Sequence, residues 1–454
     1  MKRLIRLAVL LFMAWPRPAG AQGVLIPDAD LRVQQLVASV SETRLRQLAT
    51  TLVSFGTRET LSATNSPTRG IGAARQWIFD ELKRSSTRLQ VTFDTYNLPP
   101  QGRITRAVEL RNVMAVLPGR TNRRVYISGH YDSLNLGSSQ QVFNTTTTNE
   151  NPQLRPDFNH DADAAGANDD GSGTVLTLEL ARVFAESGMT FDGTLVFICW
   201  AGEEQGLFGS TLHARRLAAE KVSIDALFNN DIVGNIHGGN GVVDAESVRV
   251  YSLGPEDSMS RALARYIEKA AGIYVPSHRI RLMAREDRFG RGSDHSSFTQ
   301  VGYPAVVFRE ANENFSKQHG AADTLEGVDF AYLAQNARVN AASAAALALA
   351  PPAPKVTGDR GQSLIARTPA GYDADLRWSA SPGAVAYRIY WRDTWTNNWE
   401  RSQTVGNVTQ FVLPNVSIDD FVFGVAAVGA DGHESLISAY VSPPRAATDV
   451  KVTK

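Results

Sequence analysis

The chain has 454 residues, of which 43% are hydrophobic and 20% are charged. This composition is typical of a globular protein that is long enough for more than one domain. Lysine and arginine together number 46, as do aspartate and glutamate, so the formal net charge is zero. The balanced charge argues against nucleic acid or an anionic membrane surface as a partner.

The first 21 residues have the pattern of a secretory signal peptide. The segment 1–6 is basic, 7–15 is apolar, and Ala19-Gly20-Ala21 has the small-x-small form that precedes a cleavage site. A membrane anchor would need roughly 20 apolar residues, and this run is shorter. No later stretch of the sequence is long and apolar enough to span a bilayer. We therefore expect an exported protein, periplasmic or extracellular.

The segment from residue 28 to residue 349 alternates between helical and strand patterns. Apolar spacing predicts helices over 28–53, 70–83, 174–185, 258–271 and 330–349. Short apolar runs predict strands over 89–96, 112–117, 125–128, 194–200, 226–228, 248–251 and 305–308. The polar stretch 135–157 is expected to be a surface loop. This alternation predicts an α/β domain with a mixed, largely parallel sheet flanked by helices.

The pattern changes after residue 350. Ala350-Pro-Pro-Ala-Pro354 is typical of a linker, and the clearest strands beyond it are 374–378, 386–391 and 421–428. We expect a signal peptide over 1–21, a larger domain over 22–350, a linker over 351–356 and a small β-sandwich over 357–447. The β-sandwich resembles a fibronectin type III module through Trp378, Tyr387-Arg-Ile-Tyr390 and the run 425–432.

The segment 194–206 is central to the functional interpretation. Its apolar strand is followed by two adjacent carboxylates, Glu203 and Glu204, and it contains Cys199, the single cysteine of the chain. One cysteine cannot form an intramolecular disulfide, and its position in an apolar run predicts a buried, inert thiol. The two carboxylates leave the strand in different directions, which suggests two separate roles.

There are four other polar clusters. Three of them come after apolar runs, and one opens the helix that begins at residue 174. They contain His130 and Asp132, Asp169 and Asp170, Asp231, and His319. In α/β sheets, sites form at the carboxyl ends of the strands. Two histidines and several carboxylates converging there are the ligands expected for a pair of divalent ions.

The chemistry of such a centre suggests a use for each residue type. Two ions roughly 3.5–4 Å apart can share a water, lower its pKa and polarise a carbonyl oxygen. The turn after Asp169 is rich in glycine and allows a close approach, so it is expected to supply the bridging ligand. One carboxylate of Glu203-Glu204, if it does not bind metal, can take the proton from that water. Asp132 lies where it could hydrogen-bond the far nitrogen of His130.

These motifs also carry a family resemblance. GHYDS, GANDDGSG, AGEEQGLFGS, NNDIVG, GSDHSSF and HGAADT occur in this order within roughly residues 44–350. The chain resembles the co-catalytic zinc metallopeptidases that include bacterial secreted leucyl aminopeptidases, plasma-type glutamate carboxypeptidases and glutamate carboxypeptidase II. The resemblance implies a zinc exopeptidase fold and two zinc ions.

The resemblance also implies a role for each residue. His130 and Asp231 would hold one zinc ion, Glu204 and His319 the other, and Asp169 would bridge them. Glu203 would be the general base, and Asp132 would orient His130. Several relatives carry a tyrosine close to the last ligand that stabilises the oxyanion, but here Gln318 precedes His319. Tyr131, Tyr303 and His295 are alternative donors, and the sequence does not choose among them.

We expect from this resemblance an exopeptidase, and first an aminopeptidase, that acts on peptides or proteins. A carboxypeptidase or dipeptidase would use the same site. Glutaminyl cyclase is a further alternative, but it should not need the complete two-metal ligand set. A non-catalytic binding protein would be expected to have lost ligands, and none is lost. We expect Arg309-Glu310 to be a salt-bridged strand end, and the C-terminal domain to contact a polymer or cell surface.

Overall fold

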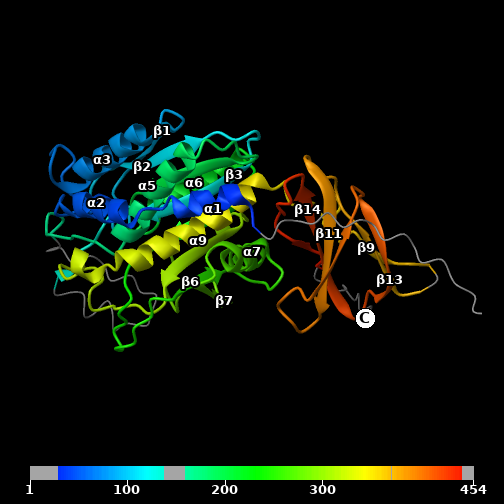
Figure 1. The fold of residues 1–454 in the computed structure, drawn as a ribbon. Coiled ribbons are helices and arrows are strands. Elements are labelled where there is room, and N and C mark those ends of the chain that lie inside the picture. Colours follow the sequence, from blue (N-terminus) through cyan, green and yellow to red (C-terminus); the bar gives the residue numbers. More distant parts are fainter. Residues whose placement is uncertain (1–28, 138–158, 370, 442–454) are drawn as a thin grey trace, which may run out of the picture.

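The computed structural model describes residues 29–137, 159–369 and 371–441 (Figure 1). The predicted signal peptide, most of the predicted loop 135–157 and the last residues of the predicted β-sandwich lie outside these ranges. None of the helices in the described ranges is long and apolar enough to cross a membrane.

The larger domain contains the predicted alternation of helices and strands. Its helices are α1 (Leu31–Ala38), α2 (Glu42–Val53), α3 (Gly70–Ser85), α5 (Gly171–Glu186), α6 (Phe208–Ala219), α7 (Met259–Tyr274), α8 (His295–Thr299), the short η2 (Leu325–Gly327) and α9 (Phe330–Leu349). Its strands are β1 (Gln90–Leu98), β2 (Val108–Leu117), β3 (Arg124–His130), β4 (Thr194–Trp200), β5 (Ile224–Asn230), β6 (Ser247–Ser252), β7 (Arg279–Met283) and β8 (Ala305–Glu310). The helix predicted over 28–53 is two helices, because Ser41 caps a new helix through the backbone N–H of Arg44.

The eight strands form one mixed sheet in the order β1-β2-β4-β3-β5-β8-β6-β7. The four strands in the middle, β4, β3, β5 and β8, run parallel to one another. Strand β2 is antiparallel to β4, and β6 is antiparallel to β8. The predicted mixed, largely parallel sheet is confirmed. Its parallel centre brings the carboxyl ends of β3, β4 and β5 to the same edge.

Strand β4 is buried on both faces, and its side chains alternate between two cores. Leu195, Phe197 and Cys199 belong to the larger core, which also contains side chains of α5 and α9. Val196, Ile198 and Trp200 belong to a smaller core on the other face, with Ala214 and Leu217 of α6 and Phe298 of α8. This period-2 alternation explains the continuous apolar run of β4. The predicted burial of Cys199 is confirmed, and burial raises the pKa of its thiol.

The C-terminal domain is an antiparallel β-sandwich, as expected. One sheet has the order β13-β10-β9 and the other β12-β11-β14-β15. The strands are β9 (Ile365–Arg367), β10 (Asp373–Arg377), β11 (Ala384–Asp393), β12 (Arg401–Val405), β13 (Gln410–Ser417), β14 (Phe421–Gly429) and β15 (Ser438–Ala439). Trp378, Tyr387, Ile389 and Val425 are part of its separate apolar core.

The two domains contact each other beside α9 and α7 (Figure 1). Their contacts include the ion pairs Asp257–Arg392, Arg32–Asp431, Lys269–Glu434 and Asp30–His433, at 2.6, 2.7, 2.9 and 2.9 Å. Leu436 also packs into the larger core. The segment predicted to be a linker is also packed, because Ala350, Pro351 and Pro354 are buried. The β-sandwich therefore packs against the larger domain through an interface, in addition to the covalent connection.

Candidate metal centre

The predicted site residues meet at the carboxyl edge of the parallel strands. His130 is the last residue of β3, Glu203 and Glu204 follow β4, and Asp231 follows β5. Asp169 precedes the amino terminus of α5, and His319 lies in the loop after β8. Short connections after buried strands hold these side chains, so the sheet sets the spacing between them.

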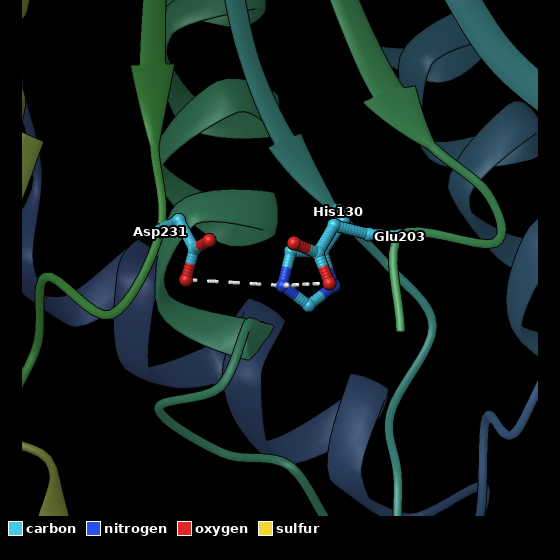
Figure 2. A group of neighbouring side chains, drawn as sticks. All are labelled: His130, Glu203 and Asp231. Carbon is cyan, nitrogen blue, oxygen red and sulfur yellow. Dashed lines mark ion pairs between the residues drawn. The ribbon is translucent and has the colours of Figure 1, made fainter. Parts of the chain in front are cut away.

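One group of side chains surrounds His130 on the β5 side. His130 Nε2 lies 3.9 Å from Glu203 Oε2 and 3.8 Å from Asp231 Oδ1. In Figure 2, dashed lines join the imidazole of His130 to both carboxylates, which come from different strand ends. All three residues offer ligand atoms within 4.8 Å of one another. This arrangement suits a small divalent cation.

A second group includes the other predicted histidine. His319 Nε2 lies 3.1 Å from Asp169 Oδ2 and 3.3 Å from Glu204 Oε2. The other oxygen of Asp169, Oδ1, lies 3.4 Å from His130 Nε2. Asp169 therefore contacts both histidines through separate oxygens, as a bridging carboxylate between two ions would.

The charges of the site favour bound cations. Burial and then the carboxylate of Asp169 raise the pKa of Glu204, and burial and then Asp231 raise that of Glu203. Burial alone would lower the pKa of His130, but Glu203 and the other carboxylates outweigh it and raise the pKa. Within the described residues, Glu204 Oε1 is buried and accepts no hydrogen bond.

Buried carboxylate oxygens without a donor are costly unless a cation compensates them. Imidazole nitrogens together with carboxylate oxygens are the ligands that zinc takes in proteins. The residues present therefore fit zinc. The two-ion assignment remains a proposal, which is supported by Asp169 because its two oxygens contact His130 and His319.

Asp132 differs from the expectation in the atom that it uses. His130 Nδ1 hydrogen-bonds the backbone carbonyl of Asp132 at 3.1 Å, while the carboxylate Oδ1 is 3.6 Å away. The carboxylate instead accepts the backbone N–H groups of Glu203 and Glu204 at 3.2 and 3.1 Å. Asp132 thus orients His130 with its main chain and holds the Glu203-Glu204 turn with its side chain.

The structure adds two carboxylates that the sequence interpretation had not assigned a role. Asp170 accepts the backbone N–H of His130 at 2.9 Å, that of Gly173 at 2.8 Å and that of Ile232 at 3.2 Å. It therefore joins the end of β3, the start of α5 and the segment after β5. Asp323 accepts the N–H of Asp169 at 2.8 Å. The helix-capping position of Asp170 was the signal available in the sequence.

Two arginines and a serine also fix the ligand segments. Arg58 is fully buried and donates to the carbonyl oxygens of Tyr131, Ala165 and Gly166, at 2.6, 2.5 and 2.8 Å. Arg309 pairs with Asp231 Oδ1 at 2.5 Å and with Asp287 Oδ2 at 2.9 Å, and Ser293 donates to Asp231 Oδ2 at 2.5 Å. The predicted salt-bridged strand end at Arg309 is confirmed.

The candidate oxyanion donors are engaged elsewhere. Tyr131 donates its hydroxyl to the carbonyl of Arg111 at 2.8 Å, and Tyr303 donates to that of Val222 at 2.9 Å. His295 is buried, and its Nε2 lies 2.9 Å from the carbonyl of Glu286. These contacts leave none of the three in a position to serve a substrate at the metal ligands without rearrangement.

Comparisons with known proteins agree with this chemistry. The sequence pattern of Peptidase family M28 matches residues 112–344. A probable zinc metalloprotease of Pyricularia oryzae is 37% identical over 467 aligned residues, which cover 93% of this chain and 87% of the relative. Because so much of this chain is covered, the match must extend into the C-terminal β-sandwich.

Two solved structures share the fold. The LapA aminopeptidase of Legionella pneumophila is 19% identical with a TM-score of 0.52, over 70% of this chain and 74% of that one. A glutaminyl cyclase of Porphyromonas gingivalis is 16% identical with a TM-score of 0.52, over 67% of this chain and 97% of that one. Because an aminopeptidase and a cyclase match equally well, the fold does not distinguish these activities.

Proposed function

Because this chain belongs to peptidase family M28, we propose that it is an exported exopeptidase with two zinc ions that removes the amino-terminal residue of peptides. The family and the probable zinc metalloproteases that resemble the chain make it a zinc metallopeptidase, and peptides are its substrates. The observation that carries the finer proposal is the ligand arrangement around Asp169, whose two oxygens contact His130 and His319.

We assign the ligands as the family resemblance implies. His130 and Asp231 would hold one zinc ion, Glu204 and His319 the other, and Asp169 would contact both. When bound, zinc acts as a Lewis acid that polarises a carbonyl oxygen and lowers the pKa of water. Glu203 takes the proton from the attacking water and returns it to the leaving amine. Arg309, Ser293 and Asp170 hold the ligand segments in place.

The amino-terminal direction is supported by the aminopeptidase of Legionella pneumophila that shares the fold. The charge of the site does not choose the direction, because two zinc ions would neutralise the four carboxylates of Asp169, Glu203, Glu204 and Asp231. A carboxypeptidase or dipeptidase would use the same site, with a cationic group that binds the carboxyl end of the substrate.

The first test compares a peptide that has a free amino terminus with its acetylated form. We expect cleavage only of the free-amine peptide, its loss on chelation and its return with zinc. Metal analysis should find two zinc ions per chain. Glu203→Gln should keep the metal and lower kcat by about 10²–10⁴-fold, because the proton acceptor is removed. The exposed Glu220 gives a matched control, and Glu220→Gln should retain activity.

Other outcomes would select the alternatives. Cleavage of both peptides from the carboxyl end would reverse the direction and keep the site. Zinc binding without any cleavage would favour the cyclase or a binding protein. Export is tested on the same preparation after expression with the natural amino terminus. Mass spectrometry should find a mature chain that begins at Gln22, and an intact Met1 in the exported fraction would contradict the predicted cleavage.

A further inference from the structure

A cluster of arginines lies next to the metal centre and surrounds one buried glutamate, Glu313. Three of these arginines have close carboxylate partners. Arg249 and Arg288 pair with Glu313 at 2.7 and 2.6 Å, and Arg309 pairs with Asp287 at 2.9 Å. Burial would raise the pKa of Glu313, but Arg288 and the other arginines outweigh it and lower the pKa to about 2. Both carboxylate oxygens of Glu313 are therefore already paired, one with Arg249 and one with Arg288.

Arg291, the fourth arginine, is compensated less well. Within the described residues its one ion pair is with Glu313 Oε2 at 3.5 Å, and that oxygen already pairs with Arg288. Its two terminal nitrogens both donate to the neutral amide oxygen of Gln318, at 3.2 and 3.3 Å. Burial and then the neighbouring charge of Arg288 lower the pKa of Arg291 to about 10. An additional anion would stabilise this guanidinium.

The position of Arg291 connects it to the metal ligands. It lies two residues before Ser293, which donates to Asp231. Its partner Gln318 immediately precedes His319 in the chain. The side chain of Arg291 is 24% exposed, compared with 15% for Arg249, 8% for Arg288 and 0% for Arg309. Of the four arginine side chains, that of Arg291 is the most exposed.

An exposed aromatic ring lies against this guanidinium. Its carbon lies 5.0 Å from the ring centre of Phe315, which is 44% exposed. The ring supports one face of the cation and supplies no competing charge. The planar fork of an arginine binds a carboxylate through two parallel hydrogen bonds, which gives both affinity and orientation.

Resting on the proposed peptidase function, we propose that Arg291 binds a carboxylate of the peptide substrate and thereby determines specificity. The carboxylate has two possible sources in a peptide, an acidic side chain or the terminal carboxyl group of a short substrate. Both present the same planar anion to the guanidinium.

The test uses pairs of peptides that differ only by a carboxylate and an amide. Comparing leucyl-leucine with its carboxyl-terminal amide tests whether the terminal carboxylate is recognised. Two further pairs test recognition of an acidic side chain. They are leucyl-glutamate amide with leucyl-glutamine amide, and glutamyl-leucine amide with glutaminyl-leucine amide. For each pair, kcat and KM are measured with the zinc-loaded full-length protein. We expect the wild-type protein to prefer the acid in at least one pair, and that pair identifies the source.

Arg291→Met should reduce this preference by about 10–100-fold, mainly through KM, because a charge-assisted hydrogen bond to the substrate is removed. Arg291→Lys keeps the charge without the fork and should retain part of the preference. Arg285 is an exposed arginine of the same loop, so Arg285→Met is the matched control and should retain the full preference. Zinc content and thermal midpoint verify that each variant is folded.

Two results would overturn the inference while leaving the peptidase intact. They are cleavage without preference for an acid in any pair, and a preference that Arg291→Met retains in full. Absence of cleavage of every peptide by the zinc-loaded wild-type protein would contradict the proposed function itself, and the inference with it. The measurement on the wild-type protein thus distinguishes failure of the proposed peptidase function from failure of the inference about Arg291.

Discussion

Asp170 positions the metal centre although it is not assigned as a ligand. Its two carboxylate oxygens accept backbone N–H groups from three segments, which carry His130, the helix α5 and the residue after Asp231. An ionised carboxylate can accept from all of these donors at once, whereas a side-chain amide has only one accepting oxygen. The carboxylate of Asp170 therefore holds these three segments in their relative positions.

We predict that Asp170→Asn weakens zinc binding by about 10–100-fold, as expected when a group that supports metal ligands is lost. The amide nitrogen would face a backbone N–H, and the two donors would repel each other. Zinc affinity is measured by competition with a chelator of known affinity. Asp163 is an exposed carboxylate paired with Arg69, so Asp163→Asn is a control that should bind zinc normally. Unchanged affinity in Asp170→Asn would contradict the assigned role.

At the scale of elements, the centre depends on loops that are joined by buried charges. Glu313 follows β8, Arg249 belongs to β6, and Arg288 lies between β7 and α8. The pKa of Glu313 is lowered from 4.5 to about 2. A carboxylate with a lowered folded-state pKa stabilises the fold above its unfolded pKa, and this stabilisation is lost as the pH falls towards the folded value.

We predict that Glu313→Gln lowers the free energy of unfolding by about 3 kcal/mol at pH 7, on the scale of the pKa shift. The difference from the wild-type protein should become smaller between pH 4.5 and pH 2, where the native carboxylate becomes protonated. Urea unfolding at several pH values measures this difference. Loss of zinc in acid affects both proteins, so comparing them isolates Glu313. A difference that is constant with pH would refute the prediction.

At the scale of the whole molecule, the β-sandwich and the larger domain share a surface. Arg392 of β11 is 3% exposed and pairs with Asp257, which precedes α7, at 2.6 Å. Leu436 of the β-sandwich packs into the core of the larger domain. The fungal relative matches this chain along 93% of its length, so the two domains occur together there too. Contact of the β-sandwich with a polymer or cell surface, and its fibronectin type III character, stay predictions.

We predict that Arg392→Met destabilises the protein by about 1–3 kcal/mol, because it leaves the partly buried carboxylate of Asp257 without its partner. Calorimetry should show a single unfolding transition for the wild-type protein and a lower or split transition for the variant. In the part of the chain that the structure describes, the ion pairs of Arg401 are exposed and lie within the β-sandwich, so Arg401→Met is the control. An unchanged transition in Arg392→Met would show that the ion pair does not couple the domains.

Many residues of the candidate metal centre could be predicted because apolar runs, helix caps and polar clusters are visible in short stretches of the sequence. Helix α9 spans Phe330–Leu349 as predicted, and Asp329 caps it through the N–H of Tyr332. The strands β3, β4 and β5 are apolar runs that end at polar clusters, and parallel strands bring those ends together. In contrast, β7 is a short, largely half-buried strand with two arginines, and α8 has five residues. Neither has enough residues for a periodic pattern to be recognised.

By itself, the sequence determined the fold class, the residues that meet in the candidate metal centre and the burial of Cys199, because these depend on spacing along the chain. Only the tertiary structure decided that Asp132 uses its carbonyl towards His130, that Arg309 pairs with Asp231, and that Arg291 shares the carboxylate of Glu313 with Arg288. The partners of these groups come from separate strands and loops. Their hydrogen bonds and ion pairs depend on how the packed sheet places backbone and side-chain atoms, and no local pattern encodes those distances.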